Sequence, residues 1–305
     1  MVEKYNKKIN MTNKEIILAG KIAQDIKKYI KPLVKKGVPL LEIAEKIESK
    51  IYELKGKPAF PTNLSINEIA AHYTPTYNDE TLAYGLIKVD FGVHINGYIS
   101  DTSFSVDLEN SEQNKKLIEA SEKALEQAKK IIGKDVSTNE IGKAIQKAIE
   151  SYGFSPIINL SGHQIEKYNL HSGLSIPNID DKRTTEITPG LYAIEPFSTN
   201  GSGKVKDGKL SGIYSLIDYK NIRNQSAREI LEYIAEEYKE LPFCSRWLIK
   251  KFGTKALPAL NQLEQNGNLH QYAQLVEVGK GIVAQSEDTI LIEEDGKKII
   301  TTSEK

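Results

Sequence analysis

The sequence predicts an α+β protein in which antiparallel strands are covered by helices. Apolar residues alternate with polar ones over residues 87–95 and 102–106, which is the spacing of half-buried strands. The Asn96–Gly97 dipeptide between these runs is the strongest short signal for an antiparallel hairpin, because a type I′ turn needs positive φ at both positions. Several other stretches repeat apolar residues at helical spacing. A chain of 305 residues can form one large domain or two ordinary ones.

Four helices are predicted in the first half of the chain from apolar spacing and capping signals. They start at a Thr12–Glu15 capping box, at about residue 40, after Ser111, and at a Ser137–Glu140 capping box. The first should end or kink at Pro32, because the proline ring is incompatible with a helix interior. The second is expected to end near Leu54 and the fourth near Gly153.

Two apolar strands are predicted in the second half of the chain, over residues 192–196 and 282–293. The second is turned back by Asp295–Gly296 into residues 298–301. The stretch of about 210–272 differs in composition, since it is rich in Lys, Glu, Gln and Asn and shows mostly helical spacing. We expect it to be a helical insert between two strand regions.

Two aspartates in the predicted hairpin occupy positions where apolar side chains are normally hidden. With the Asn-Gly turn at the tip, Asp90 opposes Ser103 and Asp101 opposes Gly92. Because side chains alternate along a strand, the two aspartates share one face, with Cβ atoms about 7–8 Å apart or less. Two carboxylates there repel each other unless a cation lies between them. The alternative is that both face water on a polar side of the hairpin.

The other candidates are histidines in unusual settings and acids inside apolar strands. They are His72, His163, His171, Glu195 and Glu287. A glutamate in such a strand is unfavourable unless it is paired or bound to a metal. The alternatives are structural histidines and edge-strand acids facing solvent, and His94, on the face of the aspartates, is expected at the surface. Together, four carboxylates and one imidazole would form an oxygen-rich dinuclear metal site.

Charge and cysteine content argue against several classes of protein. Lys+Arg and Asp+Glu both total 41, so the net charge gives no general attraction for nucleic acid or an anionic membrane. No stretch approaches the about 20 apolar residues of a membrane span, and the N-terminal stretch lacks the apolar core of a signal peptide. The single Cys244 cannot form an internal disulfide, which fits a reducing compartment. We therefore expect a cytoplasmic protein.

Six motifs along the chain carry a resemblance to a known family. In order, they are FPTNLSINEIAAHYTP, VDFGVHINGYISDT, NLSGHQIEKYNLHSG, YAIEPF, PFCSRWL and VAQSEDTIL. From about Lys14 onward, the chain resembles the type 2 methionine aminopeptidases, which have the creatinase-like pita-bread fold. The resemblance implies a single catalytic domain over residues 1–305, in which helices cover a curved antiparallel sheet. It also implies that the segment of about 210–272 is the helical insert of the type 2 enzymes.

The resemblance implies a metal site for two divalent ions. Its ligands would be Asp90, Asp101, His163, Glu195 and Glu287. Asp101 and Glu287 match the bridging carboxylates, Asp90 a terminal ligand of one ion, and His163 with Glu195 the ligands of the other. This hard donor set without thiolate suits cobalt, manganese, iron or zinc, and so leaves the identity of the metal open.

The resemblance also assigns catalytic and substrate-binding residues. His72 would contact the scissile amide, His171 would steady the tetrahedral intermediate, and Glu195 would move the proton of the attacking water. The methionine pocket would be lined, beside the two histidines, by Phe60, Leu170, Phe197, Ile213 and Tyr272. Ile213 departs from family members that have a histidine there, which leaves the polarity of the pocket open.

The implied function is removal of the N-terminal methionine from nascent proteins with a small second residue, by a metal-bridged hydroxide. Nascent N-termini are the expected partners, contact with the ribosome is left open, and no membrane or specific nucleic acid is expected. A monomer is expected. The alternatives are a proline-specific peptidase and a non-catalytic ribosome- or RNA-associated protein of the same fold. The first is disfavoured by the 89 residues before Asp90 and by the insert, and the second by the intact ligand set.

Overall fold

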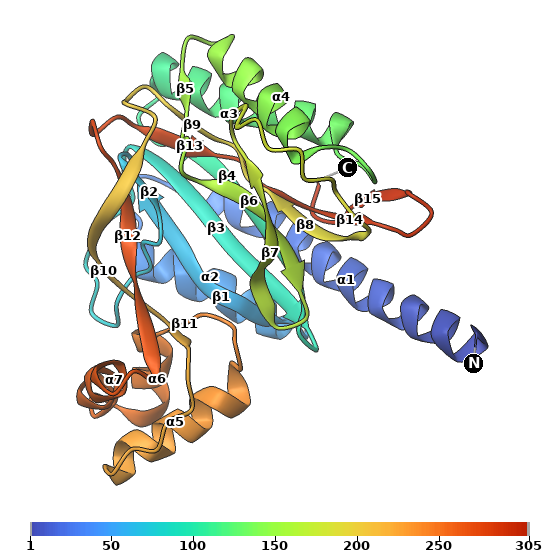
Figure 1. Cartoon of the computed structure of the whole chain (residues 1–305). Helices are drawn as coiled ribbons and strands as arrows, with labels where there is room; N and C mark the ends of the chain where they lie inside the picture. The colour runs from blue at the N-terminus through green and yellow to red at the C-terminus, as the bar shows by residue number, and fades with distance from the viewer. Residues whose placement is uncertain (1, 304–305) are drawn as a thin grey trace.

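Helices cover antiparallel strands in the folded chain, which confirms the α+β prediction (Figure 1). The computed structural model describes residues 2–303, with side chains from Asn13 onward. The helices are α1 (Val2–Ile30), η1 (Lys31–Leu33), α2 (Leu40–Glu53), α3 (Glu112–Ile131), α4 (Thr138–Glu150), α5 (Gln225–Glu237), α6 (Ser245–Phe252) and α7 (Ala256–Gln265).

The strands form several antiparallel sheets. They are β1 (Lys57–Ile66), β2 (Ile69–Ala71), β3 (Leu86–Ile95), β4 (Tyr98–Asp107), β5 (Ser155–Pro156), β6 (Ser161–Glu166), β7 (Asn169–Pro177), β8 (Gly190–Ile194), β9 (Phe197–Thr199), β10 (Val205–Leu216), β11 (Phe243–Cys244), β12 (Leu269–Glu277), β13 (Val283–Gln285), β14 (Asp288–Ile292) and β15 (Lys298–Ile300). The sheet orders are β1-β3-β4, β11-β10-β12-β2, β13-β9-β5 and β15-β14-β8-β6-β7.

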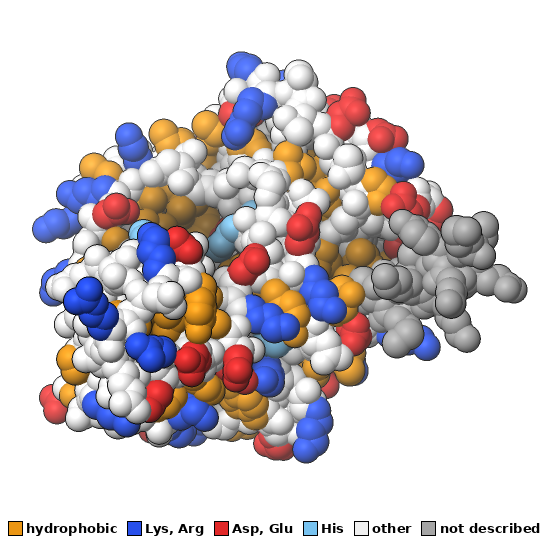
Figure 2. All heavy atoms as spheres, turned by 60° about the horizontal axis from the view of Figure 1, so that its bottom comes forward, with side chains coloured by type: hydrophobic (Ala, Val, Ile, Leu, Met, Phe, Trp, Pro, Cys, Tyr) orange, Lys and Arg blue, Asp and Glu red, His pale blue; other side chains and the backbone are white. Residues whose placement is uncertain are grey.

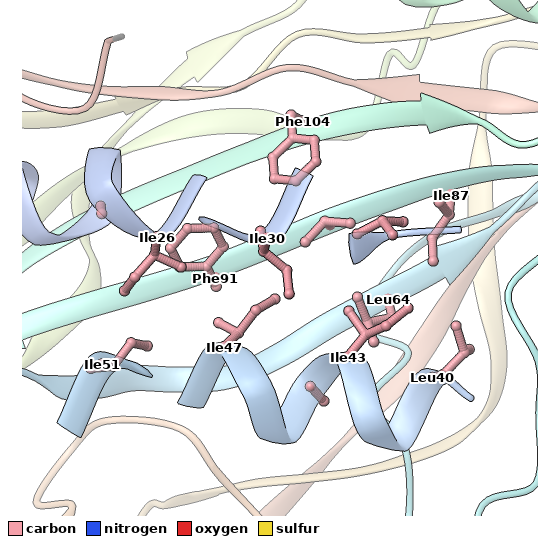
Figure 3. Close-up of a cluster of buried hydrophobic side chains, with 14 of the residues drawn as sticks. Ile26, Ile30, Leu40, Ile43, Ile47, Ile51, Leu64, Ile87, Phe91 and Phe104 are labelled. Atoms are coloured by element: carbon pink, nitrogen blue, oxygen red, sulfur yellow. The ribbon is translucent and has the colours of Figure 1, made fainter. Parts of the chain in front are cut away.

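The largest core lies between α1, α2 and the β1-β3-β4 sheet (Figure 3). Ile26 of α1 and Ile47 of α2 lie beside Phe91 of β3, and all three side chains are buried. Helices α3 and α4 contact each other and cover strands β7, β9 and β13 on another side of the molecule (Figure 1). Helices therefore cover the apolar face of the β3–β4 hairpin, and a functional site can form on its other face.

The hairpin has the predicted register. Asp90 pairs with Ser103, and Gly92 pairs with Asp101, with Asn96 at positive φ in the turn. Since the apolar side chains of β3 pack against α1 and α2, both aspartates lie on the opposite face. The prediction that they share a face is confirmed.

The predicted helix starts are confirmed in three of four cases. Helix α2 covers the predicted segment, Ser111 caps α3, and Ser137 closes the predicted capping box of α4. The predicted start at Thr12 is wrong, because α1 already begins at Val2 and ends before Pro32. Residues 2–11 contain neither glycine nor proline, so the local capping signal does not interrupt the helix.

Two predicted segments differ from the structure, one in its middle and one at its ends. The strand predicted over residues 282–293 is divided into β13 and β14, because β13 pairs with β9 and β14 with β8. The chain changes sheets at Ser286–Glu287. The segment predicted as helical over about 210–272 contains α5, α6 and α7, but residues 210–216 and 269–272 are strand, in β10 and β12. Figure 1 shows these two strands leading to the three helices.

Candidate metal centre

A cavity of about 230 Å³ opens between β1, the β3–β4 hairpin, β6, β7, β10 and β12. It is lined by every residue that the sequence marked as a candidate ligand, catalytic group or pocket residue: Phe60, His72, Asp90, Asp101, His163, Leu170, His171, Glu195, Phe197, Ile213, Tyr272 and Glu287. Figure 2 shows hollows on this side of the molecule that contain hydrophobic and histidine side chains. The fold thus gathers residues, from Phe60 to Glu287, that are separated by up to about three quarters of the chain.

Strand alternation and a glycine create the floor of the cavity. Asp90 and Asp101 project from neighbouring strands onto the same side of the hairpin, and Gly92 lies directly opposite Asp101. A Cβ atom on Gly92 would lie 2.4 Å from Cε1 of Phe60. The missing side chain therefore lets the Phe60 ring lie directly over the hairpin, beside the two carboxylates.

The remaining ionisable groups come from three other segments. His163 is in β6, Glu195 follows β8, and Glu287 lies where the chain passes from β13 to β14. His163 Nε2 is 3.6 Å from Asp101 Oδ2 and 3.7 Å from Glu195 Oε1. Asp101, His163 and Glu287 each offer a ligand atom, and these atoms lie within 4.8 Å of one another. The imidazole thus faces a group of carboxylates.

Gln285 is a residue of the site that the sequence did not single out, and it contacts two of the carboxylates. This buried side chain donates from Nε2 to Glu195 Oε2 at 3.3 Å and to Glu287 Oε2 at 3.5 Å. It lies two residues before Glu287, so the alternation of β13 was a signal that could have found it. Gln285 holds the two glutamates toward each other.

Burial and mutual repulsion dominate the electrostatics of the carboxylates. Burial raises the pKa of Asp90 to about 7. Burial first, and then the charge of Asp90, raise the pKa of Asp101 well above its usual range. The pKa values of Glu195 and Glu287 are raised in the same way, by burial and then by neighbouring carboxylates. Four carboxylates gathered in one largely desolvated site are stable in the charged form only with cations among them.

The three histidines in the cavity are neutral at neutral pH. Burial lowers the pKa of His163 and of His72, and it lowers the pKa of His171 to about 4. His72 Nδ1 lies 3.2 Å from the carbonyl oxygen of Ala273, which can only accept, so Nδ1 carries the proton. Its Nε2 is then left as an acceptor. His72 also has φ of 64°, an unusual backbone conformation of the kind that gathers at functional sites.

The environment expected for His94 is wrong. It was expected at the surface, but its side chain is buried, accepts a hydrogen bond from the Gly97 amide and contacts the Tyr168 ring. Burial lowers its pKa to about 4. The β6–β7 turn covers this end of the hairpin, which local periodicity could not reveal.

The donor set fits divalent metal ions. Asp90 Oδ1 and Asp101 Oδ1 are buried, and neither has a hydrogen-bond partner among the described residues. A buried acceptor without a donor is unfavourable, and a bound cation would give these oxygens the electrostatic partner that no hydrogen-bond donor provides. Carboxylate oxygens with a neutral imidazole form the hard donor set of manganese, iron, cobalt and zinc sites. The site defines a class of protein, the metal-dependent hydrolases.

Comparison with known proteins identifies the family within that class. Residues 14–294 match the model of metallopeptidase family M24, and the chain belongs to this family. A relative from Methanocaldococcus jannaschii named methionine aminopeptidase is 48% identical over 290 residues, which cover 94% of this chain and 97% of that protein. The resemblance to the methionine aminopeptidases is thus confirmed.

Solved structures confirm the pita-bread fold. The structure of a thermophilic Arx1 matches with a TM-score of 0.82 at 17% identity, over 96% of this chain and 91% of that chain. Methionine aminopeptidase from Rickettsia prowazekii matches with a TM-score of 0.70 at 20% identity, over 96% and 98%. In the described part of the chain, no helix is long and apolar enough to cross a bilayer.

Proposed function

We propose that this chain is a methionine aminopeptidase, which removes the N-terminal methionine from polypeptides with a small second residue. One observation carries the proposal. The complete set of carboxylates and histidines lines one cavity in a chain that is 48% identical, over nearly its whole length, to a protein of that name.

In this proposal, two divalent ions are held by Asp90, Asp101, His163, Glu195 and Glu287. Asp101 and Glu287 would be the ligands common to both ions, which is supported by the ligand atoms that they and His163 place within 4.8 Å of one another. When bound, such ions lower the pKa of a water molecule toward neutrality and polarise the carbonyl of the scissile bond.

The chain's own groups orient the substrate and move protons. His72 presents an unprotonated Nε2, which suits acceptance of a hydrogen bond from the scissile amide N–H. His171 is neutral, with its ring centroid 4.3 Å from that of His163, and its N–H donates to the carbonyl oxygen as negative charge develops there. Glu195 accepts a proton from the attacking water and passes it to the leaving nitrogen.

The apolar part of the cavity lining suits an unbranched apolar side chain. Phe60, Leu170, Phe197 and Ile213 are buried at the cavity, and Tyr272 closes it with its ring against His72. Methionine fits such a space because its flexible thioether adapts to apolar surfaces. Ile213, from the strand that leads to α5, makes this part of the pocket apolar. We also propose that the segment containing α5–α7 is the type 2 insert.

The proposed setting is the cytoplasm, where the monomeric chain meets nascent polypeptides at or near the ribosome. The single, buried Cys244 supports a reducing compartment, since nothing in the described chain depends on a disulfide.

Metal reconstitution of the purified protein tests the proposed function. Added manganese, iron or cobalt is expected to release methionine from Met-Ala-Ser faster than from the Met-Val counterpart, with no cleavage of Xaa-Pro peptides. Asp101→Ala should be inactive, whereas Asp218→Ala, at an exposed carboxylate, should match the wild type. Metal binding without hydrolysis, preference for Xaa-Pro, or full activity of Asp101→Ala would contradict the proposal.

A further inference from the structure

Asn63 lies in the cavity wall with an unpaired acceptor. Its side chain is 4% exposed, and Nδ2 donates to the carbonyl oxygen of Pro61 at 3.1 Å. Because a proline carbonyl can only accept, this bond fixes which end of the amide is nitrogen. The other end, Oδ1, is buried and has no hydrogen-bond partner among the residues that the structure describes.

A β-bulge turns Asn63 toward the site. Phe60 pairs with Gly92 and Asn63 pairs with Asp90, so three steps along β1 match two steps along β3. Without the extra residue, Phe60 and Asn63 would point to opposite faces of the sheet. With it, both share the face of Asp90, and both line the cavity. Bulges next to active sites commonly re-aim a side chain in this way.

Buried contacts hold the bulge in place. The Thr62 amide donates to Glu48 Oε1 at 3.3 Å, and Thr74 Oγ1 donates to the Thr62 carbonyl at 2.9 Å. Glu48 is itself fixed by two hydrogen bonds from Arg246, at 2.6 and 2.8 Å. The extra residue therefore has its backbone polar groups satisfied, and the orientation of Asn63 is built into the fold.

The surroundings of Asn63 Oδ1 define the ligand that it can take. Asn63 directly opposes Asp90 across the strands, which puts their Cβ atoms about 4.5–5.5 Å apart. Both Asp90, when ionised, and Asn63 Oδ1 only accept hydrogen bonds. A substrate group that forms hydrogen bonds to both must donate more than one hydrogen. The free amine at a peptide's N-terminus does so, whereas an internal peptide nitrogen has a single N–H.

We propose that Asn63 is a substrate-binding residue that accepts a hydrogen bond from the free α-amine of the substrate. This inference rests on the proposed function and adds to it a subsite for the amine, shared with Asp90. The subsite accounts for a preference for chain ends, because the nitrogen of an internal residue cannot satisfy both acceptors.

Binding of two small products tests the inference. L-methionine and its des-amino analogue, 4-(methylthio)butanoate, would be titrated calorimetrically into the manganese-loaded wild type and into Asn63→Leu, which keeps the size of the side chain and removes the acceptor. Affinity for methionine should fall about tenfold or more, the value of one hydrogen bond to a charged group. Affinity for the des-amino analogue should stay unchanged. Asn63→Ala is the second variant, with the same expected pattern, in case the leucine disturbs folding.

Each other outcome overturns the inference. Equal losses of affinity for methionine and for the des-amino analogue would mean that Asn63 only shapes the pocket. No loss of affinity would mean that Asn63 Oδ1 contacts solvent and not the ligand. A drop in bound manganese per chain would make it part of the metal site. Hydrolysis of Met-Ala-Ser by the wild type, measured in parallel, separates these results from failure of the proposed function.

Discussion

At the scale of single residues, the raised pKa of Asp90 makes the stability of the metal-free protein depend on pH. Burial raises its pKa to about 7 from an ordinary value near 4. Between these two pH values the folded protein binds a proton that the unfolded chain does not. The protonated carboxyl therefore contributes stability below pH 4, and this contribution is lost as the pH rises through about 7.

We predict this loss for the metal-free protein in comparison with Asp90→Asn, a variant that cannot ionise. The free energy of unfolding of the wild type, minus that of Asp90→Asn, should decline as the pH rises from about 4 to about 7. Urea titrations with a chelator present, at several pH values, measure the difference. A constant or rising difference would show that Asp90 is not buried as described.

Gly92 is the residue at which a single methyl group should alter the pocket. In Gly92→Ala, the new Cβ would meet the Phe60 ring, and the ring must move into the cavity. We expect kcat/KM for Met-Ala-Ser to fall about tenfold or more. Gly133→Ala is the matched control, since its Cβ would have no neighbour closer than 3.8 Å. Equal activities of the two variants would exclude Phe60 from the pocket wall.

At the scale of elements, one buried ion pair joins α2 to α6. Glu48 and Arg246 are both buried, and Arg246 Nε also donates to the Pro75 carbonyl at 3.0 Å. Trp247 donates its indole N–H to Glu48 at 2.8 Å. Arg246 and Trp247 of the motif PFCSRWL thus connect α6, through Glu48, to the β1 bulge. Arg246 also connects α6 directly to the segment that follows His72.

Breaking this pair from one side should be costly. Arg246→Met leaves the Glu48 carboxylate buried without its cation, which is expected to lower the free energy of unfolding by about 3–5 kcal/mol. Adding Glu48→Gln should restore part of the loss, because no buried charge remains. Urea unfolding measures the free energy of unfolding of the single and of the double variant. Lys46→Ala, in an exposed pair with Glu42, should have almost no effect, and an equally small effect of Arg246→Met would contradict this role.

Local sequence signals could predict the elements whose apolar residues repeat regularly or that are joined by a recognisable turn. The Asn96–Gly97 turn determined the register of β3 with β4, and with it the shared face of the two aspartates. The bulge in β1 and the passage from β13 to β14 depend on pairing with distant strands. Local periodicity carries no information about such partners, so Asn63 and the break before Glu287 could not be predicted.

At the scale of the whole molecule, the cavity depends on chain segments that are far apart. Its ionisable groups come from the β3–β4 hairpin, from β6, from the end of β8 and from the link between β13 and β14. The ligand set and its convergence were predicted through family resemblance, whereas local patterns alone showed only that the two aspartates share a face. A metal ion that joins these segments also stabilises them, by about 2.7 kcal/mol at a concentration of 100 times Kd.

Diffraction from crystals soaked in manganese tests the central claim, that five distant side chains form one site for two ions. Anomalous maps of the wild type should show two peaks about 3.5–4 Å apart in the cavity, both in contact with Asp101 and Glu287. Asp101→Ala crystals should lose at least one of them. A cavity free of peaks in the wild type, or peaks bound only at surface carboxylates, would contradict the account.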